Sequence, residues 1–168
     1  MRGIEQCVRF GVTTVGDISQ QMHLTRPILR DASVRSISYG TLPVLLQAEG
    51  RWLADARARR FALLANNGCP WALTDLALAD LAGTNPGLLN VPLPGYFTPE
   101  QMAHVLDDAG IDAVLTDQAA TVAGLKLGFE QAGVSARTGL ALWQRAEPSD
   151  ATPVPAGTVK ITYTSGST

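Results

Sequence analysis

Short apolar runs alternate along this chain with stretches of helical spacing, and this alternation limits the fold more than any other feature. Residues 61–65, 88–93 and 111–116 are apolar runs of strand length. Residues 70–82 and 98–109, which lie between them, carry helical patterns. Strands joined by helices pair in parallel through right-handed crossovers. The sequence therefore predicts an α/β fold with a mostly parallel sheet, incomplete in this chain, and helices on both faces.

The amino-terminal third is less regular. Residues 27–30 and 36–39 are expected to be extended and to form a hairpin. A helix is predicted after Thr41, although Gly50 within it costs about 1 kcal/mol relative to alanine. The apolar residues that recur at helical spacing there, with Trp52 expected as a core anchor, are Leu45, Ala48, Trp52 and Ala56.

The clearest helix signal lies at residues 98–109. Thr98 and Gln101 have the spacing of a capping box, and Gly110 is placed to end the helix. His104, Asp107 and Asp108 are expected on its solvated face. A cluster of basic residues lies earlier in the chain and is also expected to be solvated, in a turn before a strand. Its members are Arg57, Arg59 and Arg60.

The last third is predicted with lower regularity. Residues 119–133 carry a weaker helical pattern that Gly124 and Gly128 interrupt, and residues 139–143 are a fourth candidate strand. A proline-rich connector then leads into a final strand. We expect a single incomplete subdomain whose successive parts are a leading segment 1–26, an α/β core 27–143, the connector 144–158, and a strand with the start of a loop at 159–168.

Composition excludes several classes of function. With 46% hydrophobic residues, 17% charged residues and a net charge of −2, the chain has no electrostatic signature of nucleic-acid binding. No apolar run reaches the ~18 residues that a membrane helix needs, and no secretory signal is recognised, so a cytoplasmic location is expected. The two cysteines and two histidines are too widely separated for a redox pair or a metal site, so no metal ligand is assigned.

The chain ends in a small hydroxyl-rich loop that follows the strand-like residues Ile161, Thr162 and Tyr163. A glycine with neighbouring hydroxyls and backbone amides forms a concave set of donors suited to phosphate oxygens. The alternative is an ordinary polar turn or a frayed terminus. The residues that would bind phosphate are Thr164, Ser165, Gly166, Ser167 and Thr168.

Other nucleotide and hydrolase motifs are absent from the sequence. The chain contains no Gly-Lys-Ser or Gly-Lys-Thr string of a Walker loop and no glycine-rich dinucleotide fingerprint after residues 61–65. Ser165 or Ser167 as a hydrolase nucleophile is excluded by the missing Gly-x-Ser-x-Gly elbow. No catalytic residue is assigned.

The terminal Thr-Ser-Gly-Ser-Thr resembles the first half of the phosphate-binding loop of adenylate-forming ligases, whose motif continues through Thr-Gly-x-Pro-Lys-Gly. The resemblance, closest to acyl-CoA synthetases, covers about residues 27–168, and one turn, residues 83–87, departs from the usual pattern. The supporting elements occur in the family's order: Tyr39-Gly40-Thr41-Leu42, Asn66-Asn67, Val91-Pro92-Leu93, Thr98-Pro99-Glu100, Asp108-Ala109-Gly110 and the residues Val114 to Asp117.

This resemblance implies an ATP-dependent, Mg²⁺-assisted activation of a carboxylic acid to an acyl-adenylate. A thiol, either coenzyme A or that of a carrier protein, would then displace AMP. The loop lysine, the acid pocket and the mobile carboxy-terminal domain would lie beyond Thr168. We therefore expect the isolated chain to bind none of these cofactors tightly, to be inactive, and to self-associate through exposed apolar surface.

Two alternatives remain open at this point. The chain could be a noncatalytic binding or scaffold module that keeps the ligase subdomain. It could also be an unrelated doubly wound domain whose polar tail is accidental. The acid that would be activated cannot be inferred from these residues.

Overall fold

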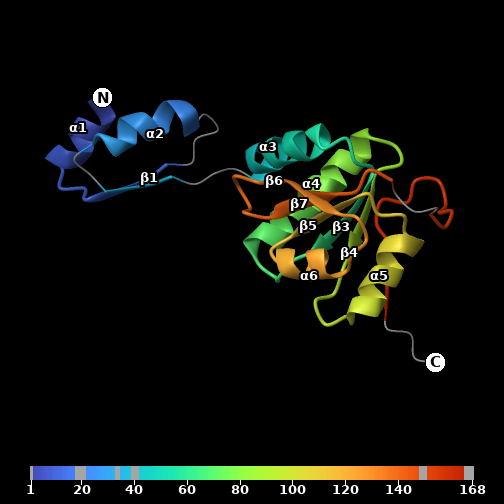
Figure 1. Cartoon of the computed structure of the whole chain (residues 1–168). Coiled ribbons are helices and arrows are strands. Elements are labelled where there is room, and N and C mark those ends of the chain that lie inside the picture. Colours follow the sequence, from blue (N-terminus) through green and yellow to red (C-terminus); the bar gives the residue numbers. More distant parts are fainter. Residues whose placement is uncertain (1, 18–21, 33–34, 39–41, 148–150, 165–168) are drawn as a thin grey trace. The chain divides into compact units, whose positions relative to one another are not determined.

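The computed structural model describes residues 2–17, 22–32, 35–38, 42–147 and 151–164. The chain divides into two compact units, Met1–Leu45 and Leu46–Thr168 (Figure 1). The division falls inside the stretch 27–143 that the sequence suggested as one core. Each unit is described by itself.

The first unit is a strand–helix–strand arrangement preceded by a helix. α1 (Arg2–Arg9) leads to β1 (Thr14–Asp17), α2 (Met22–Arg30) and β2 (Arg35–Ser38), and β1 and β2 pair in parallel. The predicted hairpin is therefore wrong, because residues 27–30 belong to α2. A run of only four residues fits a helix as well as a strand, and a crossover helix is what allows two consecutive strands to run in parallel.

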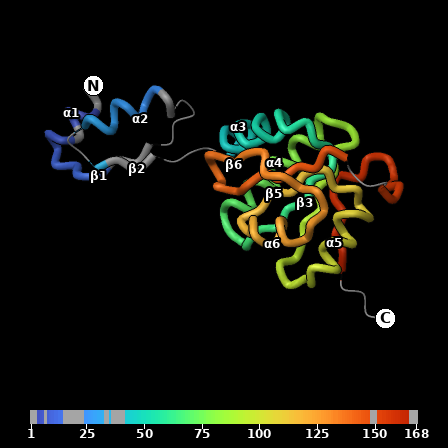
Figure 2. Tube along the Cα trace, in the orientation of Figure 1, coloured from blue at the N-terminus to red at the C-terminus, as the bar shows by residue number. Residues whose placement is uncertain are grey.

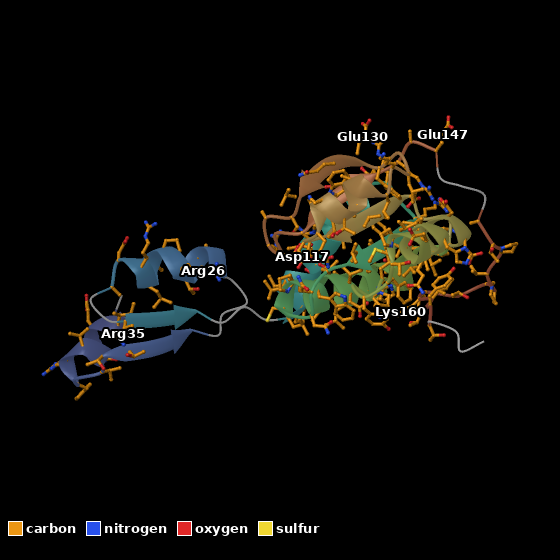
Figure 3. The ribbon with its side chains drawn as sticks, turned by 60° about the horizontal axis from the view of Figure 1, so that its bottom comes forward. Arg26, Arg35, Asp117, Glu130, Glu147 and Lys160 are labelled. Carbon is orange, nitrogen blue, oxygen red and sulfur yellow. The ribbon has the colours of Figure 1, made fainter. Side chains whose placement is uncertain are left out.

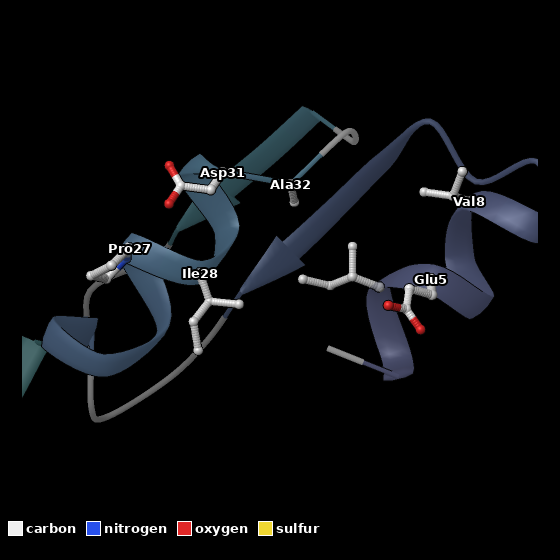
Figure 4. Close-up of a pocket in the computed structure, with 7 residues that line it drawn as sticks. Glu5, Val8, Pro27, Ile28, Asp31 and Ala32 are labelled. Atoms are coloured by element: carbon white, nitrogen blue, oxygen red, sulfur yellow. The ribbon is translucent and has the colours of Figure 1, made fainter.

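A pocket of about 520 Å³ lies within this first unit. Figure 4 shows Glu5 and Val8 of α1 on one side of it and Pro27 and Ile28 of α2 on the other. Its lining is mainly apolar, with the carboxylates of Glu5 and Asp31 among the lining groups.

The second unit is built on an open five-stranded sheet with the order β4-β3-β5-β7-β6. β3 (Arg60–Leu64) pairs in parallel with β4 (Leu89–Pro92) and with β5 (Ala113–Thr116). β6 (Glu130–Val134) and β7 (Ala141–Gln144) form a hairpin, and β7 runs antiparallel to β5. The predicted α/β class is confirmed, and β7 and β6 add antiparallel pairing at one side of the sheet.

Helices cover both faces of this sheet, as predicted. α3 (Leu42–Asp55) and α4 (Cys69–Thr84) contribute to one core cluster, and α5 (Pro99–Asp108) and α6 (Ala119–Gly124) contribute to the other (Figure 1). The strands serve both cores by alternation: Phe61 and Leu63 face the first, whereas Ala62 and Leu64 face the second. β3 is buried along almost its whole length, as expected of a central parallel strand.

α5 forms as its sequence predicts. The Thr98 hydroxyl accepts from the Gln101 amide, and the Gln101 side chain accepts from the Thr98 amide. At the other end Gly110 has a φ of 59°, its amide donates to the Asp107 carbonyl, and the amide of Ile111 donates to the Leu106 carbonyl. This is a Schellman ending, in which the left-handed residue is best supplied by glycine.

α3 forms where a helix is predicted, but its most buried residues are not the predicted apolar residues. Its buried residues are Glu49, Gly50 and Leu53, and Trp52 packs against the core only in part. The Glu49 carboxylate has no exposed surface and accepts from the hydroxyls of Ser135 (2.8 Å) and Thr138 (3.3 Å) in the β6–β7 turn. This buried polar contact with a distant turn brings a different side of α3 into the core. The spacing of apolar residues along the helix does not reveal it. The proposed cap at Thr41 lies outside the described residues.

The predicted helix at 119–133 is only half right. α6 ends at Gly124, Lys126 and Gly128 adopt positive φ values of 56° and 75°, and β6 then begins. The left-handed backbone at these positions ends the helical repeat and turns the chain into the hairpin. Among the described helices, none is long and apolar enough to cross a membrane.

Candidate nucleotide site at the end of the chain

Of the five residues predicted to bind phosphate, the structure describes Thr164, whose side chain is exposed. Ser165, Gly166, Ser167 and Thr168 lie outside the described residues. The assignment of these five residues therefore stays a prediction, and the structure bears on it through the segment that leads into the loop.

That segment, residues 159–163, lies along the outer edge of β4. The Asn90 amide donates to the Val159 carbonyl (2.9 Å), and the Ile161 amide donates to the Asn90 carbonyl (3.0 Å). The pairing is a single parallel bridge between Asn90 and Lys160, so the full strand that the sequence predicted here is reduced to one bridge. Because the bridge is parallel, the chain runs toward the side of the sheet on which β3, β4 and β5 end.

Polar side chains gather on that side of the sheet, after β3 and β5. The amide of Asn66 and its side-chain Nδ2 donate to Asp117 Oδ2, at 3.1 and 2.9 Å; Asp117 is labelled in Figure 3. Thr116 Oγ1 accepts from the Gln118 amide (2.7 Å). In open α/β sheets, ligands bind beyond the carboxyl ends of the strands. In the sequence, Asn66 and Asp117 stand out only as elements of the family resemblance, and their adjacency in space requires the parallel pairing of β3 with β5.

The bridge itself is held from α4 by a carboxylate. Asp75 accepts from Asn90 Nδ2 at 2.7 Å and forms an ion pair with Lys160 Nζ at 2.6 Å. The Asp75 side chain is only 15% exposed, and Lys160 also lies 5.9 Å above the Trp71 ring. This cluster has no signature in the sequence, because its members are far apart along the chain.

A second carboxylate, on α5, holds the same segment farther along. Asp108 Oδ1 accepts from the Thr152 hydroxyl (2.6 Å), and Asp108 Oδ2 accepts from the Tyr163 hydroxyl (2.5 Å). Figure 2 shows the final segment passing beside α5, where Ile161 and Tyr163 pack on the core cluster that contains α5 residues.

These contacts shift the protonation equilibria of both partners. The hydroxyl of Thr152, and then that of Tyr163, lowers the pKa of Asp108 below its usual value by stabilising the carboxylate. Burial, followed by donation to Asp108, raises the pKa of Tyr163 to about 12. Asp108 is thus ionised, and Tyr163 protonated, throughout the physiological range.

The predicted solvated face of α5 is correct for His104, which is exposed, and holds only in part for the two aspartates, which are partly exposed but also have tertiary partners. Asp107 forms an ion pair with Arg145 at 2.9 Å, and Asp108 makes the contacts above. Of the arginine cluster, Arg57 and Arg59 are exposed as expected, whereas Arg60 is half-buried and donates to the Ala109 carbonyl (2.7 Å). Tertiary partners arriving from other segments explain each difference.

Among the described residues, no cluster of three or more histidine, cysteine, aspartate or glutamate side chains could hold a metal ion. A second pocket, of about 400 Å³, lies at the amino ends of β3 and β4, with Arg57 and Arg59 in its lining.

A comparison with protein-family models agrees with the resemblance to adenylate-forming ligases. The comparisons with curated proteins and with solved structures found no match. A family model described as "AMP-binding enzyme" matches residues 18–168, which includes all of the second unit and the terminal loop. The chain therefore belongs to the AMP-binding enzyme family.

Proposed function

We propose that this chain supplies the first α/β part of an ATP-dependent ligase that activates a carboxylic acid as its acyl-adenylate. Membership of the AMP-binding enzyme family supports ligase-related chemistry with ATP and Mg²⁺. The observation that carries the proposal is the position of the Thr-Ser-Gly-Ser-Thr sequence. It follows directly on a segment that runs parallel to β4, toward the side where parallel sheets bind ligands.

Thr164, Ser165, Gly166, Ser167 and Thr168 are proposed to contact the β- and γ-phosphates of ATP. Four hydroxyls and the amide of a glycine provide donors for the phosphate oxygens and no acid or base. Their part in the reaction is to orient the leaving pyrophosphate and to offset the charge that grows on it. The donor set also fits Mg²⁺ carried by the nucleotide, because Mg²⁺ in such sites is held largely through phosphates and water.

We further propose coenzyme A as the thiol that accepts the acyl group, with a carrier-protein thiol as the alternative, and a cytoplasmic location. The acyl-CoA synthetase-like order of elements from Tyr39 to Asp117 supports the first of these choices. The 168 residues alone are proposed to be inactive, because the resemblance puts the loop lysine and the acid pocket outside them.

Binding of polyphosphate tests the loop assignment without requiring catalysis. Isothermal titration of the chain with inorganic tripolyphosphate and with Mg-ATP should show one weak site, and Gly166→Val should weaken this binding at least tenfold. Asp80→Asn, an exposed change on α4, serves as the control and should leave binding unchanged. Equal binding by the wild-type chain and Gly166→Val would refute the assignment. A folded chain that binds neither ligand would favour a noncatalytic binding module.

Catalysis by the chain is tested separately. Incubation with Mg-ATP and a panel of carboxylic acids should release no pyrophosphate above background. Release above background that depends on the acid would show that the 168 residues already contain a working adenylation site, and the proposed inactivity would be wrong.

A further inference from the structure

Two carboxylates, one on each face of the second unit's sheet, converge on the segment that precedes the terminal loop. Asp75 comes from α4, whose residues Ala77 and Leu78 belong to one core cluster. Asp108 comes from α5, whose residues Val105 and Leu106 belong to the other. Residues 159–163 therefore lie between two helices that are separated by the sheet.

Asp75 acts on both members of the only bridge described for this segment. One carboxylate accepts from the side chain of Asn90 and pairs with Lys160, and these two residues are the backbone partners of the bridge. Asn90 is 2% exposed, so its side chain is fixed by burial as well as by this bond. Asp75 thus sets the register of the segment against β4.

Asp108 holds both ends of residues 152–163, the stretch that brings the segment to the sheet. Thr152 binds it twice, through its hydroxyl to Oδ1 and through its amide to the Asp108 carbonyl (2.9 Å). Tyr163 binds the remaining oxygen, Oδ2, directly before Thr164. A carboxylate with both oxygens used in this way fixes the beginning and the end of residues 152–163 with respect to α5.

Successive side chains of the segment point to opposite sides, one toward Asp75 and the other toward α5. Lys160 reaches Asp75, whereas Ile161 and Tyr163 face the α5 side. A segment with a single bridge has few backbone bonds of its own, so these side-chain contacts decide where it lies. Placement matters here, because preorganised donors bind phosphate better than donors that must first be ordered.

We infer that Asp75 and Asp108 are positioning residues for the phosphate loop: they hold residues 159–163 from opposite faces of the sheet and so fix the point from which Thr164 to Thr168 extend. The loop's role rests on the function proposed above, whereas the anchoring of the segment does not. Neither carboxylate is expected to touch the nucleotide.

Amide hydrogen exchange tests the anchoring independently of any ligand. The Ile161 amide, bonded to the Asn90 carbonyl, should exchange about tenfold faster in Asp75→Asn and in Asp108→Asn than in the wild type, as expected for loss of a charged hydrogen bond. The amides of β5 should keep their wild-type rates, because the core is untouched. Lys160→Met should raise the Ile161 exchange rate as Asp75→Asn does, and the double variant should exchange no faster than either single variant. Asp80→Asn should keep the wild-type rate.

Tripolyphosphate titration of the same variants tests the positioning. The affinity should fall in Asp75→Asn and Asp108→Asn by factors similar to the increase in Ile161 exchange, and Asp80→Asn should bind as the wild type does. Unchanged Ile161 exchange in both variants, or faster exchange throughout β5, would overturn the inference. Faster exchange at Ile161 with unchanged affinity would also overturn it. If the wild type binds no tripolyphosphate, the proposed function of the loop fails for this chain, and the exchange data alone decide whether the carboxylates anchor the segment.

Discussion

Replacing Tyr163 by phenylalanine removes one hydrogen bond from the final segment and leaves the ring in place. The Tyr163 hydroxyl donates to an ionised carboxylate at 2.5 Å, and the ring packs against the core. A hydrogen bond to a charged group contributes about 1.5–3 kcal/mol net. Asp108 keeps its bond from Thr152 and is partly open to water, so the lower end applies. We expect Tyr163→Phe to reduce the free energy of unfolding by about 1.5 kcal/mol at neutral pH.

The pH dependence of this loss follows from the raised pKa of Tyr163, about 12 in the folded chain against 10.0 for a free tyrosine. A group whose pKa is higher in the folded state stabilises fully below its unfolded pKa. The stabilisation is then lost as pH rises through the folded value. The difference between wild type and Tyr163→Phe should therefore be constant up to about pH 10 and should shrink toward pH 12.

Urea unfolding followed by tryptophan fluorescence measures this difference. All three tryptophans, Trp52, Trp71 and Trp143, lie in the second unit, so the signal reports on the unit that contains Tyr163. Tyr96→Phe is the matched control, because Tyr96 is 78% exposed. Equal stability of wild type and Tyr163→Phe at pH 7, or a difference that does not change above pH 10, would refute the reasoning.

Three further outcomes are expected. Gly50→Ala should raise the free energy of unfolding by about 0.5–1 kcal/mol, because Gly50 is helical and an added Cβ meets no atom within 4 Å; a loss of stability in urea would contradict this. Glu49→Ala should cost about 1–3 kcal/mol, since the hydroxyls of Ser135 and Thr138 lose their buried acceptor, and Glu49→Gln should cost less; equal melting temperatures of the two variants would count against it. The chain should self-associate at high concentration, as exposed apolar side chains such as Phe10 at 81% suggest; sedimentation of a single monomeric species would argue otherwise.

Elements with strong local signals could be predicted from the sequence. α5 carries its own start and stop signals at Thr98 and Gly110, and β3 is an apolar run bounded by polar residues. In both cases the information lies within a few neighbouring residues, so periodicity and capping chemistry suffice.

Elements decided by distant partners could not be predicted. The stripe of α3 depends on Glu49 meeting the turn at Ser135, and β6 depends on its pairing with β7, which in turn pairs with β5. Residues 27–30 were predicted to be extended although they are helical, because a run of four residues is too short to distinguish the helical period from the strand period.

The candidate site likewise has one part with a local sequence signal and another part that depends on residues far apart in the sequence. The phosphate-binding assignment of Thr164 to Thr168 is a prediction from their residue types and from the resemblance to a family. The carboxylates that hold the preceding segment were not, because Asp75 and Asp108 are far from Lys160 and Tyr163 in sequence. Asp108 was even assigned to solvent, since a helical wheel contains no information on the chain that later covers it.

The most direct test of the account is a structure of the chain with bound tripolyphosphate. We predict that the ligand contacts the backbone amides and hydroxyls of Thr164 to Thr168, beyond the carboxyl ends of β3, β4 and β5. A ligand bound at the amino ends of these strands, in the pocket lined by Arg57 and Arg59, would contradict the account.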